Sequence, residues 1–148
     1  MSLFLLALVA CAAADINAGI VPDLIVAFIA LLGIADILFI DGVGLVADHL
    51  IGAVCVSVPM LVLSLVVKGA FGGGDIKLVA AAGLLMGSRP VAAGVFLGMF
   101  ISGFYAAYLL ILRKAGSKSK IKLVPFLAVG LSVAVLFENY ILDYIVRF

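Results

Sequence analysis

Charge is scarce in this sequence. Of its 148 residues 11% are charged and 68% are hydrophobic, and the net charge is +1. The mean hydropathy is +1.48. Soluble domains are roughly half apolar, so this chain has more apolar residue than a water-exposed fold can bury. We therefore predict a membrane protein with lipid around much of its surface. The near-zero net charge excludes a strongly basic surface of the kind that binds nucleic acid.

Metal-ligating residues and tryptophan are equally rare. Cys11 and Cys55 lie in separate apolar runs and match no metal-ligand spacing, so we expect two buried free thiols. His49 has no second histidine to complete a site, and we expect it at the surface. The sequence thus predicts no metal and no cofactor. Tryptophan is absent, which leaves tyrosine and phenylalanine for the interfacial belts.

No Lys or Arg precedes the first apolar run. Residues 1–14 resemble a secretory signal, and L-V-A-C resembles a lipoprotein cleavage box, but a signal peptide has a positively charged start. We predict a first membrane helix instead, ending in a polar turn from Asp15 to Asp23. The later apolar runs cover residues 24–40, 50–67, 76–86, 91–112 and 123–137.

Six apolar runs predict an all-α, polytopic integral membrane protein of about six transmembrane helices, with one domain over residues 1–148. About 20 apolar residues cross a hydrocarbon core. Several runs are shorter, so we expect tilt or local bilayer thinning. Pro59 is expected to kink the third run.

The cations indicate an orientation. With six helices, the connections after the first, third and fifth helices share one side. Seven cations lie there: Lys68, Lys77, Arg113, Lys114, Lys118, Lys120 and Lys122. Arg89 and Arg147 lie on the other side, so the positive-inside bias assigns the first side to the cytoplasm. The cations at 118–122 are a topology signal, or a docking patch for anionic lipid or an acidic partner. The same assignment places Asp15 and Asp75 at one level, although neither was used to derive it.

The segment K-G-A-F-G-G-G-D-I-K, residues 68–77, separates two apolar runs. Its glycines allow positive φ and close backbone approach. Asp75 follows them at the mouth of a helix, where a carboxylate is costly to desolvate and is therefore a functional candidate. Two structural alternatives stand beside this hypothesis. Asp75 would also suit a helix N-cap, and Asp15 would suit a plain interfacial position.

Two carboxylates a few ångströms apart share a proton, because both cannot easily ionise. The ionised member takes a proton from water and the neutral member polarises a scissile carbonyl, as in an aspartyl protease. A proton or ion pathway through Asp15, Asp36 and Asp75 is the competing interpretation. Asp36 lies about 20 Å beyond Asp23 along a helix, however, which puts it near the outer surface. Lys77 suits a lysine that extends to the interface.

Three motifs resemble those of type IV prepilin peptidases, which are membrane aspartyl proteases. Residues 72–87, G-G-G-D-I-K-L-V-A-A-A-G-L-L-M-G, fit the G-x-G-D signature. Asp15 with the later Val21-Pro22-Asp23 resembles the first catalytic aspartate and its Ile-Pro-Asn-like turn. Residues 122–126, K-L-V-P-F, resemble the block that opens the last helix.

The resemblance implies an enzyme of the cytoplasmic membrane that cuts the basic leader from prepilins or pseudopilins just before their hydrophobic helix, with the active site facing the cytoplasm. It implies Asp15 and Asp75 as the catalytic pair, with no metal. On the substrate side it implies Gly72, Gly73, Gly74, Lys77, Pro22 and Asp23.

Some features depart from the large bifunctional members. The methyltransferase region and the four-cysteine zinc motif are missing, so we expect no N-methylation. The short length resembles the tight-adherence (Flp pilus) subfamily. Asp23 stands where Asn is usual, and residues 16–21 hold no cation, which weakens the inference about substrate. An inactive pilus-assembly scaffold is a further alternative.

Overall fold

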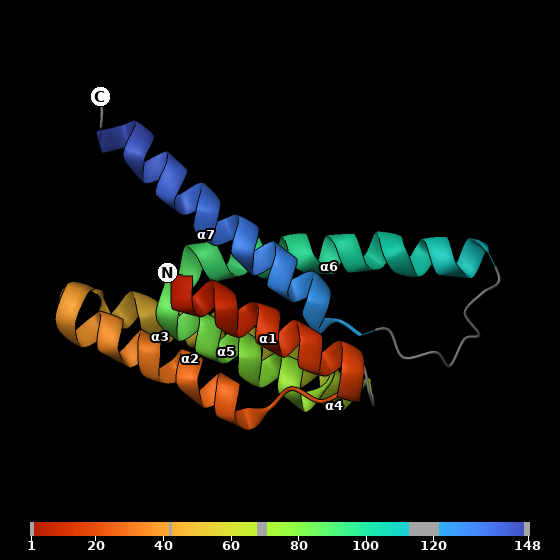
Figure 1. Cartoon of the computed structure of the whole chain (residues 1–148). Coiled ribbons are helices and arrows are strands. Elements are labelled where there is room, and N and C mark those ends of the chain that lie inside the picture. Colours follow the sequence, from red (N-terminus) through yellow and green to blue (C-terminus); the bar gives the residue numbers. More distant parts are fainter. Residues whose placement is uncertain (1, 42, 68–70, 113–121, 147–148) are drawn as a thin grey trace.

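A computed structural model describes residues 2–41, 43–67, 71–112 and 122–146, with side chains except at 40, 41, 43 and 138–146. All the secondary-structure elements formed by these residues are helices, which short turns connect (Figure 1). Two helices come first, α1 (Ser2–Ala18) and α2 (Asp23–Asp36), followed by the short helical turns Ile37–Asp41 and Val43–Leu45. The remaining helices are α3 (Val46–Cys55), α4 (Ser57–Val66), α5 (Gly73–Met86), α6 (Ser88–Ile111) and α7 (Val124–Val146). Several cations of the orientation argument, Lys68, Arg113, Lys114, Lys118, Lys120 and Arg147, lie outside the described residues.

Helices α3 and α4 form one span that is interrupted at Val56. Pro59 is the third residue of α4 and has no N–H for the Cys55 carbonyl, so the helix breaks one turn before it. The Ser57 hydroxyl donates to the Ala53 carbonyl across this break. The kink predicted from Pro59 is therefore confirmed. When α3 and α4 are taken together, the described residues form six α-helical segments besides the two short turns.

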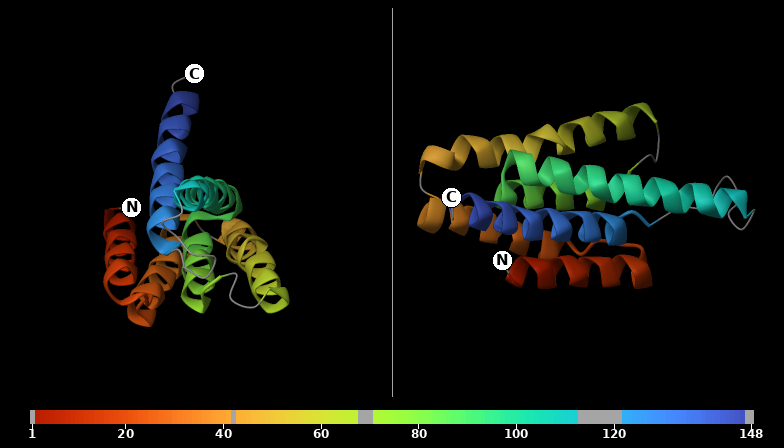
Figure 2. Two further views of the ribbon diagram at one scale, coloured as in Figure 1. Left: turned by 90° about the vertical axis from the view of Figure 1, so that its right-hand side faces the viewer. Right: turned by 90° about the horizontal axis from the view of Figure 1, so that it is seen from above.

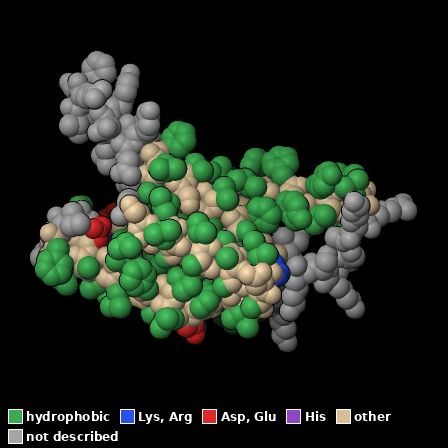
Figure 3. All heavy atoms as spheres, viewed as in Figure 1, with side chains coloured by type: hydrophobic (Ala, Val, Ile, Leu, Met, Phe, Trp, Pro, Cys, Tyr) green, Lys and Arg blue, Asp and Glu red, His purple; other side chains and the backbone are tan. Residues whose placement is uncertain are grey.

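Among the described helices, two are long and apolar enough to cross a membrane: Val46–Val66, counted through the kink, and Ser88–Ile111. Ser2–Ala18 and Val124–Phe137 are shorter apolar helices. Large apolar side chains cover the surface, for example Leu24 at 84% and Phe96 at 73% exposure, and they dominate the face in Figure 3. The all-α prediction is confirmed, whereas a crossing by each of the six segments remains a prediction.

Helix α5 occupies the middle of the bundle. The left view of Figure 2 looks along the bundle. There α1, α2, α5 and the α3–α4 pair form an arc, and α6 and α7 lie on its inner side. Helix α5 packs against α2, α3, α4, α6 and α7. Against α3 the approach is so close that a Cβ on Gly52 would lie 2.5 Å from the Gly83 carbonyl oxygen. Small residues at such contacts are how helices associate in lipid, where van der Waals packing replaces the hydrophobic effect.

The cysteine prediction is half right. Cys11, which belongs to α1, is fully buried, but Cys55 is exposed. Cys55 is the last residue of α3, next to the kink. An apolar run does not reveal which of its residues face lipid and which face protein, which is why the sequence misplaced Cys55.

Two sets of contacts define the ends of the bundle. At one end, the Lys77 ammonium lies 3.0 Å from an Asp23 carboxylate oxygen, and the Lys122 ammonium donates to the Ile16 carbonyl. At the opposite end, Asp48 accepts from the Ser88 N–H at 3.2 Å. The polar turns at residues 15–23 and 71–77 and the start of α7 thus share one end, which we call the Asp15 end. Their common end agrees with the predicted connectivity, and its assignment to the cytoplasm remains a prediction.

Candidate active site

Asp15 lies in the last turn of α1. Gly19, at φ +65°, ends the helix, and its N–H donates to the Asp15 carbonyl at 2.8 Å. The side chain is 7% exposed, and its Oδ2 is buried without a hydrogen-bond partner among the described residues. The carbonyls at a helix C-terminus also oppose a negative charge there. A carboxylate in such a position is costly for folding, and this favours a functional role over a plain interfacial one.

Asp75 lies at the other kind of helix end, in the first turn of α5. Gly72 is the N-cap and Asp75 is the third residue inside the helix, so the predicted alternative of Asp75 as the N-cap itself is wrong. Its Oδ2 accepts from the Gly72 N–H at 3.1 Å, the carboxylate half of a capping box. The position still leaves Asp75 half-buried at the mouth of α5.

The two carboxylates act on each other. Asp75 precedes the apolar run 76–86 of α5 and so lies outside the part that we predict to be in the membrane. Burial raises the pKa of Asp75, the Gly72 N–H lowers it, and the negative charge of Asp15 raises it further. Asp15 on α1 and Asp75 on α5 are 60 positions apart in the sequence, and they lie near enough for one charge to act on the other. This agrees with the predicted pair, and a shared water between the two carboxylates remains a prediction. Proton affinity in such a pair belongs to the pair and not to either residue.

The glycine segment places Asp75 by close approach. A Cβ on Gly74 would lie 2.9 Å from both Cβ and Cγ2 of Val21, so only glycine fits there. A Cβ on Gly72 would lie 3.2 Å from Asp75 Oδ2, whereas one on Gly73 would meet nothing within 4 Å. The predicted close approach is confirmed. The expected positive φ is not found at the three described glycines of the segment, because Gly72 is extended at φ −72° and Gly73 and Gly74 begin the helix. Gly69 lies outside the described residues.

The turn between α1 and α2 lies against this segment. Val21 is buried against Gly74, Pro22 is the N-cap of α2, and Asp23 starts that helix. The Lys77–Asp23 ion pair joins α5 to α2 at 3.0 Å, with the side chains 60% and 76% exposed. Lys77 does reach the surface as predicted, and its partner there is Asp23. An ion pair this exposed contributes little stability, so both charges remain open to a ligand.

Lys122 belongs to the same site, and the sequence did not single it out. Its ammonium donates to the carbonyl of Ile16, the residue after Asp15, and it is the cation that acts electrostatically on Asp15. In the sequence it appeared only as a topology cation and as the first letter of K-L-V-P-F. Its place directly before the last helix, which packs on α1, is the signal that marks it.

Two residues outside the site clarify its limits. Asp36 ends α2 at the opposite end from Asp23, so the structure keeps it away from the pair, as predicted. His49 was expected at the surface, and that prediction is wrong. It is 5% exposed, and its Nδ1 lies 2.8 Å from the Leu84 carbonyl oxygen. The tight contact between α3 and α5 draws His49 into the bundle and supplies its hydrogen bond.

Comparison with known proteins identifies the class of protein. Residues 2–107, more than two thirds of the chain, match the Type IV leader peptidase family. The chain therefore belongs to this family, whose members are membrane proteases of type IV pilus processing. The match contains Asp15, the Val21–Asp23 turn and the glycine segment, and it ends before α7.

One curated relative is the prepilin leader peptidase/N-methyltransferase of Bacillus subtilis (strain 168). It is 28% identical over 98 residues, which are 66% of this chain and 40% of the relative. The chain thus aligns with less than half of that protein. No solved structure matches.

Proposed function

We propose that this protein is a membrane aspartyl endopeptidase that removes the leader peptide from type IV prepilins or pseudopilins. The observation that carries the proposal is the buried Asp15 oxygen without a hydrogen-bond partner among the described residues, at a position from which the Asp15 charge acts on Asp75 of a different helix. Family membership supports the reaction class.

In the proposed mechanism, the two carboxylates hold one proton and one water between them. The ionised carboxylate takes a proton from the water as the water attacks the scissile carbonyl carbon, and the protonated carboxyl donates a hydrogen bond to the carbonyl oxygen. The tetrahedral intermediate then collapses: the C–N bond breaks, and the leaving nitrogen takes the proton that the first carboxylate received from the water. The unpartnered oxygen of Asp15 is free to receive the water. The Gly72 N–H orients Asp75, and Lys122 sets the charge around Asp15. None of these steps requires a metal.

The surface around the pair supports substrate binding. The Gly72–Gly74 backbone is open at Gly73, which leaves room for an extended peptide to come close. Asp23 and Lys77 offer one charge of each sign beside it, and Pro22 fixes the start of α2. We propose that this surface binds the residues around the cleaved bond.

The orientation, substrate subclass and scope complete the proposal. The excess of cations on the connections of the Asp15 end supports a site facing the cytoplasm, in the cytoplasmic membrane. We propose an Flp-type prepilin as the substrate. The proposed activity is peptide hydrolysis, which the family match supports.

The test is a co-expression assay with a candidate prepilin, read by the shift from precursor to mature size. We expect processing by the wild type and none by Asp15→Asn or Asp75→Asn at equal amounts of inserted protein. Asp36→Asn is the matched control, an acid at the opposite end of the bundle, and should retain processing. Equal loss in Asp36→Asn, with the protein still inserted, would contradict the pair and favour an ion pathway.

A further inference from the structure

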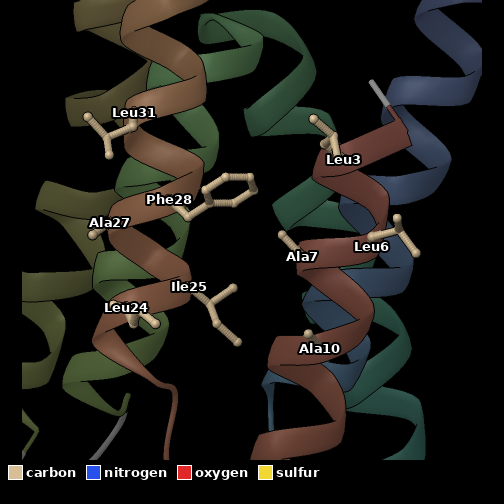
Figure 4. A pocket seen from close by; sticks show the side chains of 9 residues that line it. All are labelled: Leu3, Leu6, Ala7, Ala10, Leu24, Ile25, Ala27, Phe28 and Leu31. Carbon is tan, nitrogen blue, oxygen red and sulfur yellow. The ribbon is translucent and has the colours of Figure 1, made fainter.

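A groove of about 510 Å³ separates α1 from α2 (Figure 4). We call it the α1–α2 groove and define it by its lining from residues 3–10 of α1 and 24–31 of α2. Every lining side chain is apolar. The two helices that form it belong to different parts of the bundle, since α1 packs mainly on α7 and α2 packs mainly on α5. The groove is therefore a seam between two packed units and not a gap in one of them.

Small and large side chains alternate along the groove, as they do on surfaces that bind a helix. Ala7, Ala10 and Ala27 form hollows, and larger side chains such as Leu6 and Phe28 border them. In Figure 4, Ile25 and Phe28 project from α2 toward α1, where Ala7 faces them. Alternation of small and large apolar residues allows the side chains of a further helix to interdigitate.

One end of the groove adjoins the candidate active site. Ala10 lies five residues before Asp15 on α1, which is about 7.5 Å of helix rise. Leu24 directly follows Asp23 at the start of α2. Three carboxylates, those of Asp15, Asp23 and Asp75, therefore lie beyond the apolar lining at this end. Two ammonium groups, those of Lys77 and Lys122, lie beside them at the same end. The surface thus changes along a single direction from purely apolar to charged, with one more carboxylate than ammonium group.

We propose that the α1–α2 groove seats the hydrophobic helix of the precursor, with the start of that helix at Asp15. The inference rests on the proposed function, in which the substrate is a basic leader followed by an apolar helix. An apolar groove that continues into carboxylates is complementary to this order of charge and hydrophobicity. It also places the bond between leader and helix beside the catalytic pair. A lipid chain matches the apolar lining but has no reason to align with the carboxylates.

Photo-crosslinking tests the occupant directly. A photoreactive amino acid replaces Leu6, which lines the groove, or Val9, which lies on another face of α1; both are 65% exposed, so neither change disturbs the core. In an Asp75→Asn background, which retains the substrate, position 6 should form an adduct with the precursor and position 9 should not. Equal adducts at both positions, or only lipid adducts at position 6, would overturn the inference.

A kinetic test uses Ala10→Phe and Ala27→Phe, which fill the hollows, with Val9→Phe as control. A phenylalanine in a hollow leaves less room for the side chains of the precursor helix. We therefore expect kcat/KM for the full precursor to fall by about tenfold, with KM rising. Val9→Phe should process normally. If both groove variants process normally while the wild type is active and Asp75→Asn is inactive, the groove does not seat the precursor helix, and the proposed function still stands. No processing by the wild type would instead refute the proposed function.

Discussion

Gly74 is a position at which a single added methyl group should disturb the candidate active site. In Gly74→Ala the new Cβ would lie 2.9 Å from Cβ and Cγ2 of Val21, and ordinary contact needs another half to one ångström. Both partners are constrained, because Val21 is buried and Gly74 lies in the first turn of α5. The strain must therefore separate the Val21–Asp23 turn from the start of α5, and Asp75 moves with that helix.

Two opposing effects set the magnitude. Alanine in a helix is favoured over glycine by about 0.5–1 kcal/mol. Overpacking in a well-packed site costs about 1–3 kcal/mol. The clash should win, and Gly74→Ala should lower the free energy of unfolding by about 1–2 kcal/mol. Activity should suffer more, because a displacement of about 1 Å near a catalytic group can reduce the rate by about 10²-fold.

The assay compares unfolding in detergent for the wild type, Gly74→Ala and Gly73→Ala, together with prepilin processing for the first two. Gly73→Ala is the matched control for stability, since its Cβ meets nothing within 4 Å, and it should be as stable as the wild type or slightly more so. Val21→Gly removes both clashing carbons, and in combination with Gly74→Ala it should restore part of the processing. If Gly74→Ala were fully active and no less stable, the proposed role of the Val21–Gly74 contact would be wrong.

Four further predictions concern charge and metal. Because the negative charge of Asp15 raises the pKa of Asp75, Asp15→Asn should lower that pKa toward the usual range of a carboxyl, measured by carboxyl carbon NMR titration; an unchanged value would mean that the pair is not coupled. Processing by the wild type should decline as rising pH removes the shared proton, at a pH above that of a free carboxyl. Chelators should leave processing unchanged, and inhibition by EDTA that zinc reverses would refute the aspartyl mechanism. Asp23→Asn should cost less than about 1 kcal/mol of stability because its ion pair is exposed, while KM for a basic leader should rise; a large fall in unfolding temperature would make the pair structural.

Much of the architecture followed from local composition. Apolar runs bounded by polar turns predicted the helices, and Pro59 predicted the break at Val56 because a missing N–H acts on the backbone of its own helix. The grouping of Asp15 with Asp75 followed from counting helices and cations, which needs no knowledge of packing. These inferences rest on chain order and on local chemistry, and both are fully present in the sequence.

Other features were hidden because they depend on which neighbour a helix meets. His49 is buried against α5, where its ring lies within hydrogen-bond distance of a carbonyl 35 residues away. Cys55 is exposed although its run is uniformly apolar. Uniform hydrophobicity removes the amphipathic pattern that would indicate the inner face of a helix. Lys122 was missed because its contact with Ile16 joins residues 106 positions apart, and this depends on how the last helix packs on α1.

The sequence alone determined the helical class, the connectivity and the two candidate carboxylates, since hydrophobic runs and a glycine-rich G-x-G-D segment are properties of neighbouring residues. Tertiary structure decided how those carboxylates are held. It placed Asp15 at a helix C-terminus with a buried, unpartnered oxygen, fitted Val21 against Gly74, and left an apolar groove between α1 and α2 that leads to the pair. Those relations depend on distances between residues far apart in the chain, and only packing of the helices against one another sets them.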